Sequence, residues 1–387
     1  MMVSARGEST GWRWPPMLLL APFQFIFGLI YSWGAIAPAI HAQSGWPRAT
    51  LDLAFSLTPL ALLPAVVLAG HGLRRMSPRA MLAVALGCFT IGGAVGLVFG
   101  DSLPFMLGYS IVALGIGAGL STAACIAVVA RLYPQRRGVL GGALLALYGM
   151  SSVVSAPLFE SLNGHFGWRA ALALLLGLYA ALGWLAWAGL PVLPAQDVHL
   201  APRIGMRTML GHRSMRWALG LVLIAAPLGS ASFATVGHLT RQLGFGSSFA
   251  LVAVAAMAIG NGLGRLGFGA LADVRGGRFS RKVVLAVNAL AAAILLAVLH
   301  GLDARAFALY PLLMGLAFGG MAGKLPALAA HVVKDGHAET AFGLLFGAFA
   351  LASFLGPLAS AAFGTREALE GFAVCAIAGW LSALVAP

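Results

Sequence analysis

The chain has 387 residues, of which 60% are hydrophobic and 9% charged, and its mean hydropathy is +0.93. This composition excludes an ordinary soluble globular protein and predicts an all-α protein that crosses a membrane many times. The formal net charge of +13 would also suit a nucleic-acid partner. Most Lys and Arg residues, however, fall in alternate turns between apolar segments, which is the positive-inside pattern. We therefore predict a protein embedded in a lipid bilayer, with no nucleic-acid partner.

Twelve apolar segments are expected to span the membrane, because each approaches the roughly 20 residues that cross a hydrocarbon core. In chain order they cover about residues 15–40, 49–70, 79–99, 104–131, 139–162, 168–190, 215–238, 247–270, 281–300, 305–331, 339–362 and 368–385. The positively charged turns then place both termini in the cytoplasm, and we expect the protein in the cell inner membrane.

The longest connection follows the sixth segment and is rich in proline and charge. We expect it to separate an N-terminal six-helix bundle, residues 1–191, from a C-terminal six-helix bundle, residues 215–387, with residues 192–214 as a central cytoplasmic loop. A glycine pattern repeats between the halves, since Gly115 recurs as Gly315. The sequence thus predicts two parallel six-helix repeats with a binding site between them near the membrane midplane.

Patterns typical of enzymes and metal sites are missing from the sequence. The three cysteines, Cys88, Cys125 and Cys375, fall inside expected helices and are predicted to be small buried apolar residues. We find no Walker loop, no metal-ligand cluster and no buried nucleophile beside a base. We expect no cofactor, no metal ion and no enzymatic activity.

Two charged residues lie inside apolar segments, and both are cations. Arg265 lies deep in the eighth segment and Lys324 deep in the tenth, whereas all 11 acidic residues lie in turns, tails or within about a turn of a helix end. A cation in hydrocarbon costs roughly 3 kcal/mol or more. An anionic substrate is the simplest partner, because a guanidinium can hold a carboxylate through two hydrogen bonds. Two alternatives stay open: Lys324 could snorkel to the cytoplasmic surface, and Arg265 could bond carbonyls of neighbouring helices.

Other polar residues are weaker candidates. Asn261, one turn before the intramembrane arginine, shares its helix face and has either a packing role or a ligand contact. Tyr31 lies too deep for the aromatic belt at the membrane boundary. His238 is either proton-linked, because histidine titrates near neutrality, or an interfacial polar residue. Glu160, near an outer helix end, is expected to meet solvent, helix N-terminal amides or Arg169.

A charged turn follows the eighth segment. It matches Gly-x-Leu-Ala-Asp-x-x-Gly-x-Arg and runs from Gly269 through Asp273 and Gly276 to Arg278. This turn resembles the signature loop of the major facilitator superfamily of transporters. The resemblance implies the fold of that superfamily, with this turn as a conformational-switch loop.

Further patterns resemble the oxalate/formate antiporter and monocarboxylate transporter group. In chain order they are Tyr31-x-Trp33-x-x-x-Ala37-Pro38, Gly45-Trp46-Pro47-Arg48-Ala49, Gly115-x-Gly117-x-Gly119-Leu120, Tyr133-Pro134-x-x-Arg137-Gly138, Asn261-x-x-x-Arg265 and Leu325-Pro326-Ala327-Leu328. The likeness covers nearly the whole chain.

By this resemblance, Arg265 is the partner of the substrate carboxylate. Monocarboxylate carriers usually have an aspartate, implicated in proton coupling, where this chain has Asn261, which cannot exchange a proton. The second cation of the oxalate carriers, a lysine, corresponds here to Phe349, and their tyrosine in the fourth segment corresponds to Thr122. Lys324 is then the candidate for the missing charge. These positions, with Tyr31, complete the expected substrate site.

The sequence predicts a secondary active transporter that moves a small organic anion, a mono- or dicarboxylate, by alternating access. A coupling proton or a counter-anion is the expected second partner, in a symporter or an antiporter, and a monomer is the expected state. Two other functions stay open. The first is an efflux carrier for drugs or other hydrophobic solutes, and the second is a non-transporting membrane sensor or enzyme.

Overall fold

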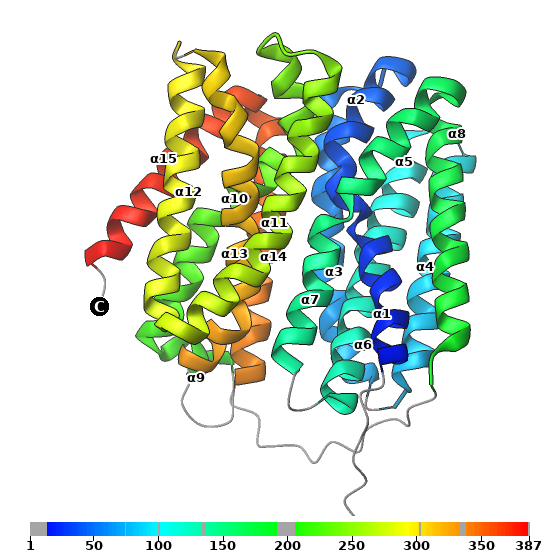
Figure 1. Cartoon of the computed structure of the whole chain (residues 1–387), viewed down its shortest axis with the longest axis horizontal. Helices are drawn as coiled ribbons and strands as arrows, with labels where there is room; N and C mark the ends of the chain where they lie inside the picture. The colour runs from blue at the N-terminus through cyan, green and yellow to red at the C-terminus, as the bar shows by residue number, and fades with distance from the viewer. Residues whose placement is uncertain are drawn as a thin grey trace, which may run out of the picture.

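The computed structural model describes residues 14–73, 75–99, 101–133, 137–191, 206–301, 303–332 and 338–385. Every regular element within these ranges is a helix, and Figure 1 shows them as two groups standing side by side. The all-α membrane fold expected from composition is confirmed.

The first group, on the right of Figure 1, holds the helices that precede residue 190. In order they are α1 (Trp14–Phe27), η1 (Gly28–Ser32), α2 (Trp33–Ser44), α3 (Arg48–Gly72), α4 (Pro78–Val98), α5 (Ser102–Phe105), the π-helical η2 (Met106–Ile116), α6 (Gly117–Leu132), α7 (Arg137–Met150) and α8 (Ser152–Gly189). Helix starts follow local chemistry. At α4, the hydroxyl of Ser77 accepts a hydrogen bond from the Ala80 amide and Pro78 takes the first turn, where its missing N–H has no cost.

The second group, on the left of Figure 1, holds the remaining described helices. They are α9 (Met206–Gly211), α10 (Arg213–Gln242), α11 (Ser247–Arg275), α12 (Gly277–Leu299), η4 (Ala304–Leu309), α13 (Tyr310–Val332), α14 (Ala338–Phe363) and α15 (Thr365–Val385). The expected central loop falls mostly on residues 192–205, which lie outside the described residues. The limits of the two bundles therefore stay a prediction.

Within the described ranges, eleven continuous stretches are long and apolar enough to cross a membrane, one fewer than expected. One of them, Leu140–Gly189, has 50 residues. At 1.5 Å per residue this is about 75 Å, more than twice the hydrocarbon core. Gly167 interrupts it with φ 78° and ψ 163°, a conformation open to glycine because it has no Cβ. The stretch thus crosses twice, and the fifth and sixth expected segments are its two parts.

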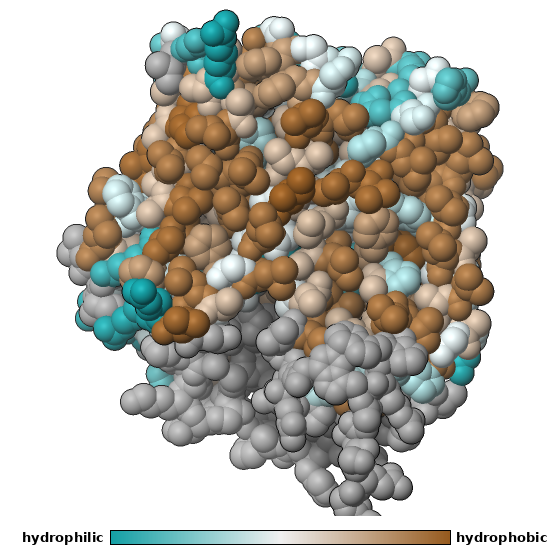
Figure 2. Space-filling model, viewed as in Figure 1, coloured by the Kyte–Doolittle hydropathy of each residue, from teal (hydrophilic) through white to brown (hydrophobic). Residues whose placement is uncertain are grey.

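The outer surface suits a lipid environment. Figure 2 shows a broad hydrophobic belt around the middle of the visible face, with hydrophilic side chains gathered toward its upper edge. Large apolar side chains such as Ile91 and Leu185 are 66% and 73% exposed. Apolar patches of this extent face lipid without penalty, whereas monomeric soluble proteins rarely expose them. The chain is a multi-pass membrane protein.

Glycines bring α11 and α13 together and so fix the register of the central helices. A Cβ added at Gly315 would overlap the carbonyl oxygen of Met257, and one added at Gly319 would overlap that of Asn261. Backbones approach this closely only where small residues line the seam. The seam holds the C-terminal half of α11, which carries Arg265, at a fixed height in the bundle.

Candidate functional site

Arg265 lies between the two groups of helices and is only 7% exposed. Its Nε donates a hydrogen bond to Oδ1 of Asn261, one turn earlier on α11, at 3.1 Å. One terminal nitrogen, Nη2, donates to the hydroxyl of Tyr31 in η1 at 2.9 Å. The structure therefore brings together three residues that the sequence singled out, and one of these hydrogen bonds links the two groups.

Two tyrosine rings lie beside this arginine, and three phenylalanine rings continue from one of them. The guanidinium carbon lies 5.6 Å from the ring centre of Tyr148 and 6.0 Å from that of Tyr31, within the range of cation–π attraction. The Tyr31 ring packs at 4.5 Å on Phe233, which packs at 5.4 Å on Phe318. We call this set the aromatic cluster; its members are Tyr31 of η1, Tyr148 of α7, Phe233 of α10, Phe318 of α13 and Phe349 of α14.

Sequence reasoning missed three members of the cluster, Tyr148, Phe233 and Phe318. A buried aromatic residue in an apolar helix looks like any packing residue, so neither phenylalanine carried a signal. The hydroxyl of Tyr148 was the only clue, and it does not stand out without the fold.

The charge of Arg265 has no counter-ion among the described residues. The described chain contains three ion pairs, none of which includes Arg265. Both of its hydrogen-bond partners are neutral. A buried charge without a partner costs several kcal/mol even after relaxation. A buried guanidinium without a described counter-ion is suited to an anionic partner.

Glycines of the neighbouring helices leave room for this site. A Cβ added at Gly149 on α7 would lie 3.1 Å from Cγ of Asn261 and 3.3 Å from Nε of Arg265. A Cβ added at Gly323 on α13 would lie 2.8 Å from Cα of Arg265. Either change would press on the arginine, so the small residues allow its side chain to fit between the helices.

Asn261 keeps an unused donor. Its Oδ1 accepts from the arginine, and its amide nitrogen Nδ2 is buried without a hydrogen-bond partner. A buried unsatisfied donor costs about 1–3 kcal/mol. Beside an arginine, this N–H group is suited to a second oxygen of a bound anion.

Lys324 is buried, 7% exposed, but the structure does not show it in contact with Arg265. Gly320, one turn earlier on α13, shares its face, and a Cβ there would meet Phe268 and Val284 of α11 and α12. The lysine therefore lies on the side of α13 that faces α12, away from the aromatic cluster. It makes no hydrogen bond or ion pair with any described residue. Its assignment to the substrate site stays a prediction.

Phe349 and Thr122, which correspond to a lysine and a tyrosine of the oxalate carriers, lie in different surroundings. Phe349 is buried and packs at 5.0 Å against Phe318, inside the aromatic cluster. Thr122 lies half-buried on α6, and no contact described in the structure joins it to Arg265. Phe349 thus lines the candidate site, while the role of Thr122 stays a prediction.

His238 lies in a second place between the two groups. It lines a small, partly open recess together with Arg48, Asp52, Thr235 and Thr365. Asp52 is 8% exposed, so an acid and a histidine from different helix groups line the same recess. Arg48 lines it too, and a neighbouring cation disfavours protonation of a histidine. The proton-linked role of His238 stays a prediction.

Glu160 has a partner that sequence reasoning did not predict. Its carboxylate lies 3.8 Å from Arg241 of α10, so this ion pair joins the first group to the second. Both side chains are about one-third exposed, at 31% and 37%, and such pairs contribute little stability on their own. The contact can break and form at small cost, as moving halves require.

The charged turn after α11 is compact. α11 ends at Arg275, Gly276 has φ 85°, and α12 begins at Gly277. A positive φ explains the glycine of the pattern. Gly269 and the exposed Arg278 lie on either side of it, while the side chain of Asp273 lies outside the described residues. The switching role of this loop stays a prediction.

Cysteine and metal chemistry play no visible part in the described chain. No group of three or more His, Cys, Asp or Glu residues there could hold a metal ion. Cys125 is buried and Cys88 is half-buried. Cys375 is exposed on α15, contrary to the expectation that all three are buried, because that face of α15 is turned outward.

Comparison with known families decides the class. The family description "Major Facilitator Superfamily" matches residues 9–357, which is most of the chain. The chain belongs to the major facilitator superfamily. It is a transporter of this superfamily, as the charged turn and the repeated halves led us to expect.

Relatives at low identity are carriers of small carboxylates by name. The chain is 28% identical to monocarboxylate transporter 13 of Bos taurus over 295 residues, covering 74% of this chain and 67% of that protein. It is 31% identical to monocarboxylate transporter 11 of Mus musculus, covering 68% of this chain and 60% of the relative. It is 24% identical to the oxalate:formate antiporter of Oxalobacter formigenes, with 93% and 88% covered. The match thus leaves about a third or more of each mammalian relative unaligned.

A solved structure supports the fold alone. The D-xylose-proton symporter superposes with a TM-score of 0.74 over 97% of both chains, at 16% identity. The superfamily fold of this transporter is therefore secure, while the low identity carries no statement about substrate.

Proposed function

We propose that this transporter moves a small organic anion with at least one carboxylate across the inner membrane by alternating access, with Arg265 as the main contact. The observation that carries the proposal is the buried guanidinium without a described counter-ion, held between the halves by Tyr31 and Asn261. The names of the relatives at 24% to 31% identity support the same substrate class.

The geometry favours a singly charged substrate with an apolar body. One cation, Arg265, lies beside the aromatic cluster, and Phe349 stands where the oxalate carriers that this chain resembles have a lysine. The aromatic cluster offers ring faces to a hydrocarbon or aromatic portion, while Nη1 of Arg265 and Nδ2 of Asn261 have no described partner. A carboxylate can occupy both donors at once.

Uptake into proteoliposomes tests the proposal. Purified protein is first screened for thermal stabilisation by organic acids, since a ligand at 100 times its dissociation constant stabilises by about 2.7 kcal/mol. The acids that stabilise are then offered as labelled substrates, with and without a proton gradient or an internal counter-anion. We expect uptake of monocarboxylates. Uptake of neutral or cationic hydrophobic solutes alone would instead support the efflux function.

Lys324→Gln tests whether Lys324 contributes to the substrate site. If Lys324 belongs to the site, the variant should lose affinity for a dicarboxylate much more than for a monocarboxylate. Because the lysine lies on the α12 side of α13, we expect small and similar changes for both substrates, within about twofold. Competition binding on the purified variant measures the two affinities, and a selective loss for the dicarboxylate would bring Lys324 back into the site.

A further inference from the structure

A cleft of about 340 Å³ opens on the outer surface of the C-terminal half, between the start of α10 and the end of α15. It is the size of a small ligand pocket. Its lining includes Arg213, Arg216, Trp217, Gly220, Ile224 and Ser382. Four of them recur at helical spacing along one face of α10, so the cleft follows that helix from its charged start into its apolar part.

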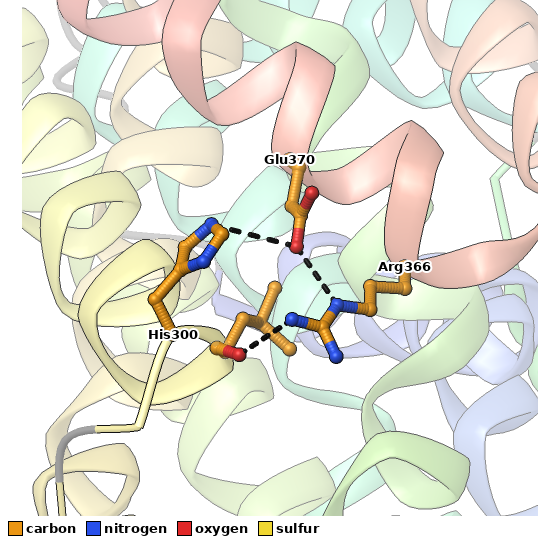
Figure 3. A network of polar contacts seen from close by, with 4 residues as sticks. His300, Arg366 and Glu370 are labelled. Atoms are coloured by element: carbon orange, nitrogen blue, oxygen red, sulfur yellow. Dashed lines mark hydrogen bonds and ion pairs between the residues drawn. The ribbon is translucent and has the colours of Figure 1, made fainter.

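The way α15 is held explains why the cleft exists. At its first turns α15 is tied to the end of α12, as Figure 3 shows: Arg366 donates to Glu370 at 2.9 Å and to the carbonyl of Leu299 at 2.7 Å, and His300 lies 3.6 Å from Glu370. Farther along, a Cβ on Gly379 would lie 3.2 Å from Ile224, so α15 approaches α10 closely there. In Figure 1, α15 slants outward toward the C-terminus.

The cleft combines a cationic mouth with an apolar wall. Arg216 donates through Nη1 to the carbonyls of Leu210 and Gly211 at 3.0 and 2.8 Å, which holds its guanidinium at the boundary where the span begins. Arg213 is exposed and forms no ion pair or hydrogen bond with a described residue. Farther along α10, Trp217 and Ile224 are 38% and 41% exposed, and tryptophan is typical of a membrane boundary.

We propose that this cleft binds one anionic phospholipid, with the phosphate between Arg213 and Arg216 and an acyl chain along Trp217, Gly220 and Ile224. Three properties favour this occupant. The two arginines supply charge complementarity that no described carboxylate satisfies. The wall beside them includes Trp217 and Ile224, which are partly exposed and belong to a helix apolar enough to cross a membrane. Basic pockets between helices at a membrane boundary suit anionic headgroups.

Lipid retention measured by native mass spectrometry tests the proposal on the delipidated full chain. Phosphatidylglycerol is titrated in parallel with phosphatidylcholine of the same acyl chains. We expect one phosphatidylglycerol to be retained per protein. Arg213→Gln and Arg216→Gln should each lower its apparent affinity about fivefold. Arg75→Gln, which removes another exposed arginine outside the cleft, should leave it unchanged.

Gly220→Leu separates binding in the cleft from attraction to surface charge. A Cβ at Gly220 meets nothing within 4 Å, and Gly220 lines the cleft, so a larger side chain there takes up space in the cleft and should improve helix propensity. We expect the retained lipid to be lost although both arginines remain and the thermal unfolding midpoint without lipid does not fall. Equal retention of both lipids, unchanged retention in Gly220→Leu, or displacement of the lipid by millimolar inorganic phosphate would each overturn the proposal.

Discussion

Arg265→Ala is expected to abolish specific carboxylate uptake, while the protein still inserts and folds. The variant removes the one cation in the aromatic cluster together with its hydrogen bonds to Tyr31 and Asn261. Removing one partner of a desolvated, hydrogen-bonded charge pair costs about 2–5 kcal/mol, which is a loss of roughly thirtyfold or more in affinity. Initial uptake rates in proteoliposomes, normalised to reconstituted protein, measure the effect.

Arg265→Lys separates charge from geometry. Lysine keeps the positive charge but lacks the planar fork, so it cannot hold a carboxylate through two parallel hydrogen bonds. We expect uptake to fall about tenfold, less than in the alanine variant. Arg305→Ala, at an exposed arginine of η4, is the matched control and should transport normally. Near wild-type uptake by a well-expressed Arg265→Ala carrier would make Arg265 a structural residue and refute the anion site.

The centre of the site could be predicted from sequence because its signals are local. An arginine inside an apolar segment is unusual on grounds of solvation alone, and Asn261 lies one turn away on the same helix. Their hydrogen bond at 3.1 Å follows from that spacing. Tyr31 was a candidate because of its depth, but its bond to Arg265 spans 234 positions of the chain and depends on how the halves pack.

The rest of the candidate site depends on which way each helix face points and on how the helices pack together. The hydropathy of the sequence encodes neither. Lys324 and Arg265 have similar depths in their helices, yet no described hydrogen bond joins their side chains, because Lys324 shares the face of Gly320 toward α12. Phe233 and Phe318 join the aromatic cluster through ring contacts between separate helices. The break at Gly167 was expected only as a boundary between two segments, since a single glycine in a helical pattern does not reveal its φ.

Gly237→Val is expected to reduce transport at least tenfold without removing the substrate site. Gly237 on α10 meets Gly34 on α2, and a Cβ added there would overlap the carbonyl oxygen of Gly34. The contact joins the two halves at the end where Glu160 pairs with Arg241. A branched side chain must hold the halves apart at this end, so the arrangement seen here becomes a minor state. A carrier that cannot return through this state cannot complete its cycle.

Two measurements identify the block as conformational. Thermal stabilisation by the carboxylate should persist in Gly237→Val, because Arg265 and the aromatic cluster are untouched. The second measurement uses a chain in which Cys88, Cys125 and Cys375 are replaced by serine and Thr235→Cys is introduced. Thr235 is only 3% exposed and lines the recess between the halves. The new cysteine should react faster with a membrane-impermeant thiol reagent when Gly237→Val is also present. Gly177→Ala is the control, since a Cβ there meets nothing within 4 Å and alanine favours the helix. Unchanged transport in Gly237→Val would contradict this prediction. It would show that the transport cycle does not need the close backbone contact between Gly34 and Gly237.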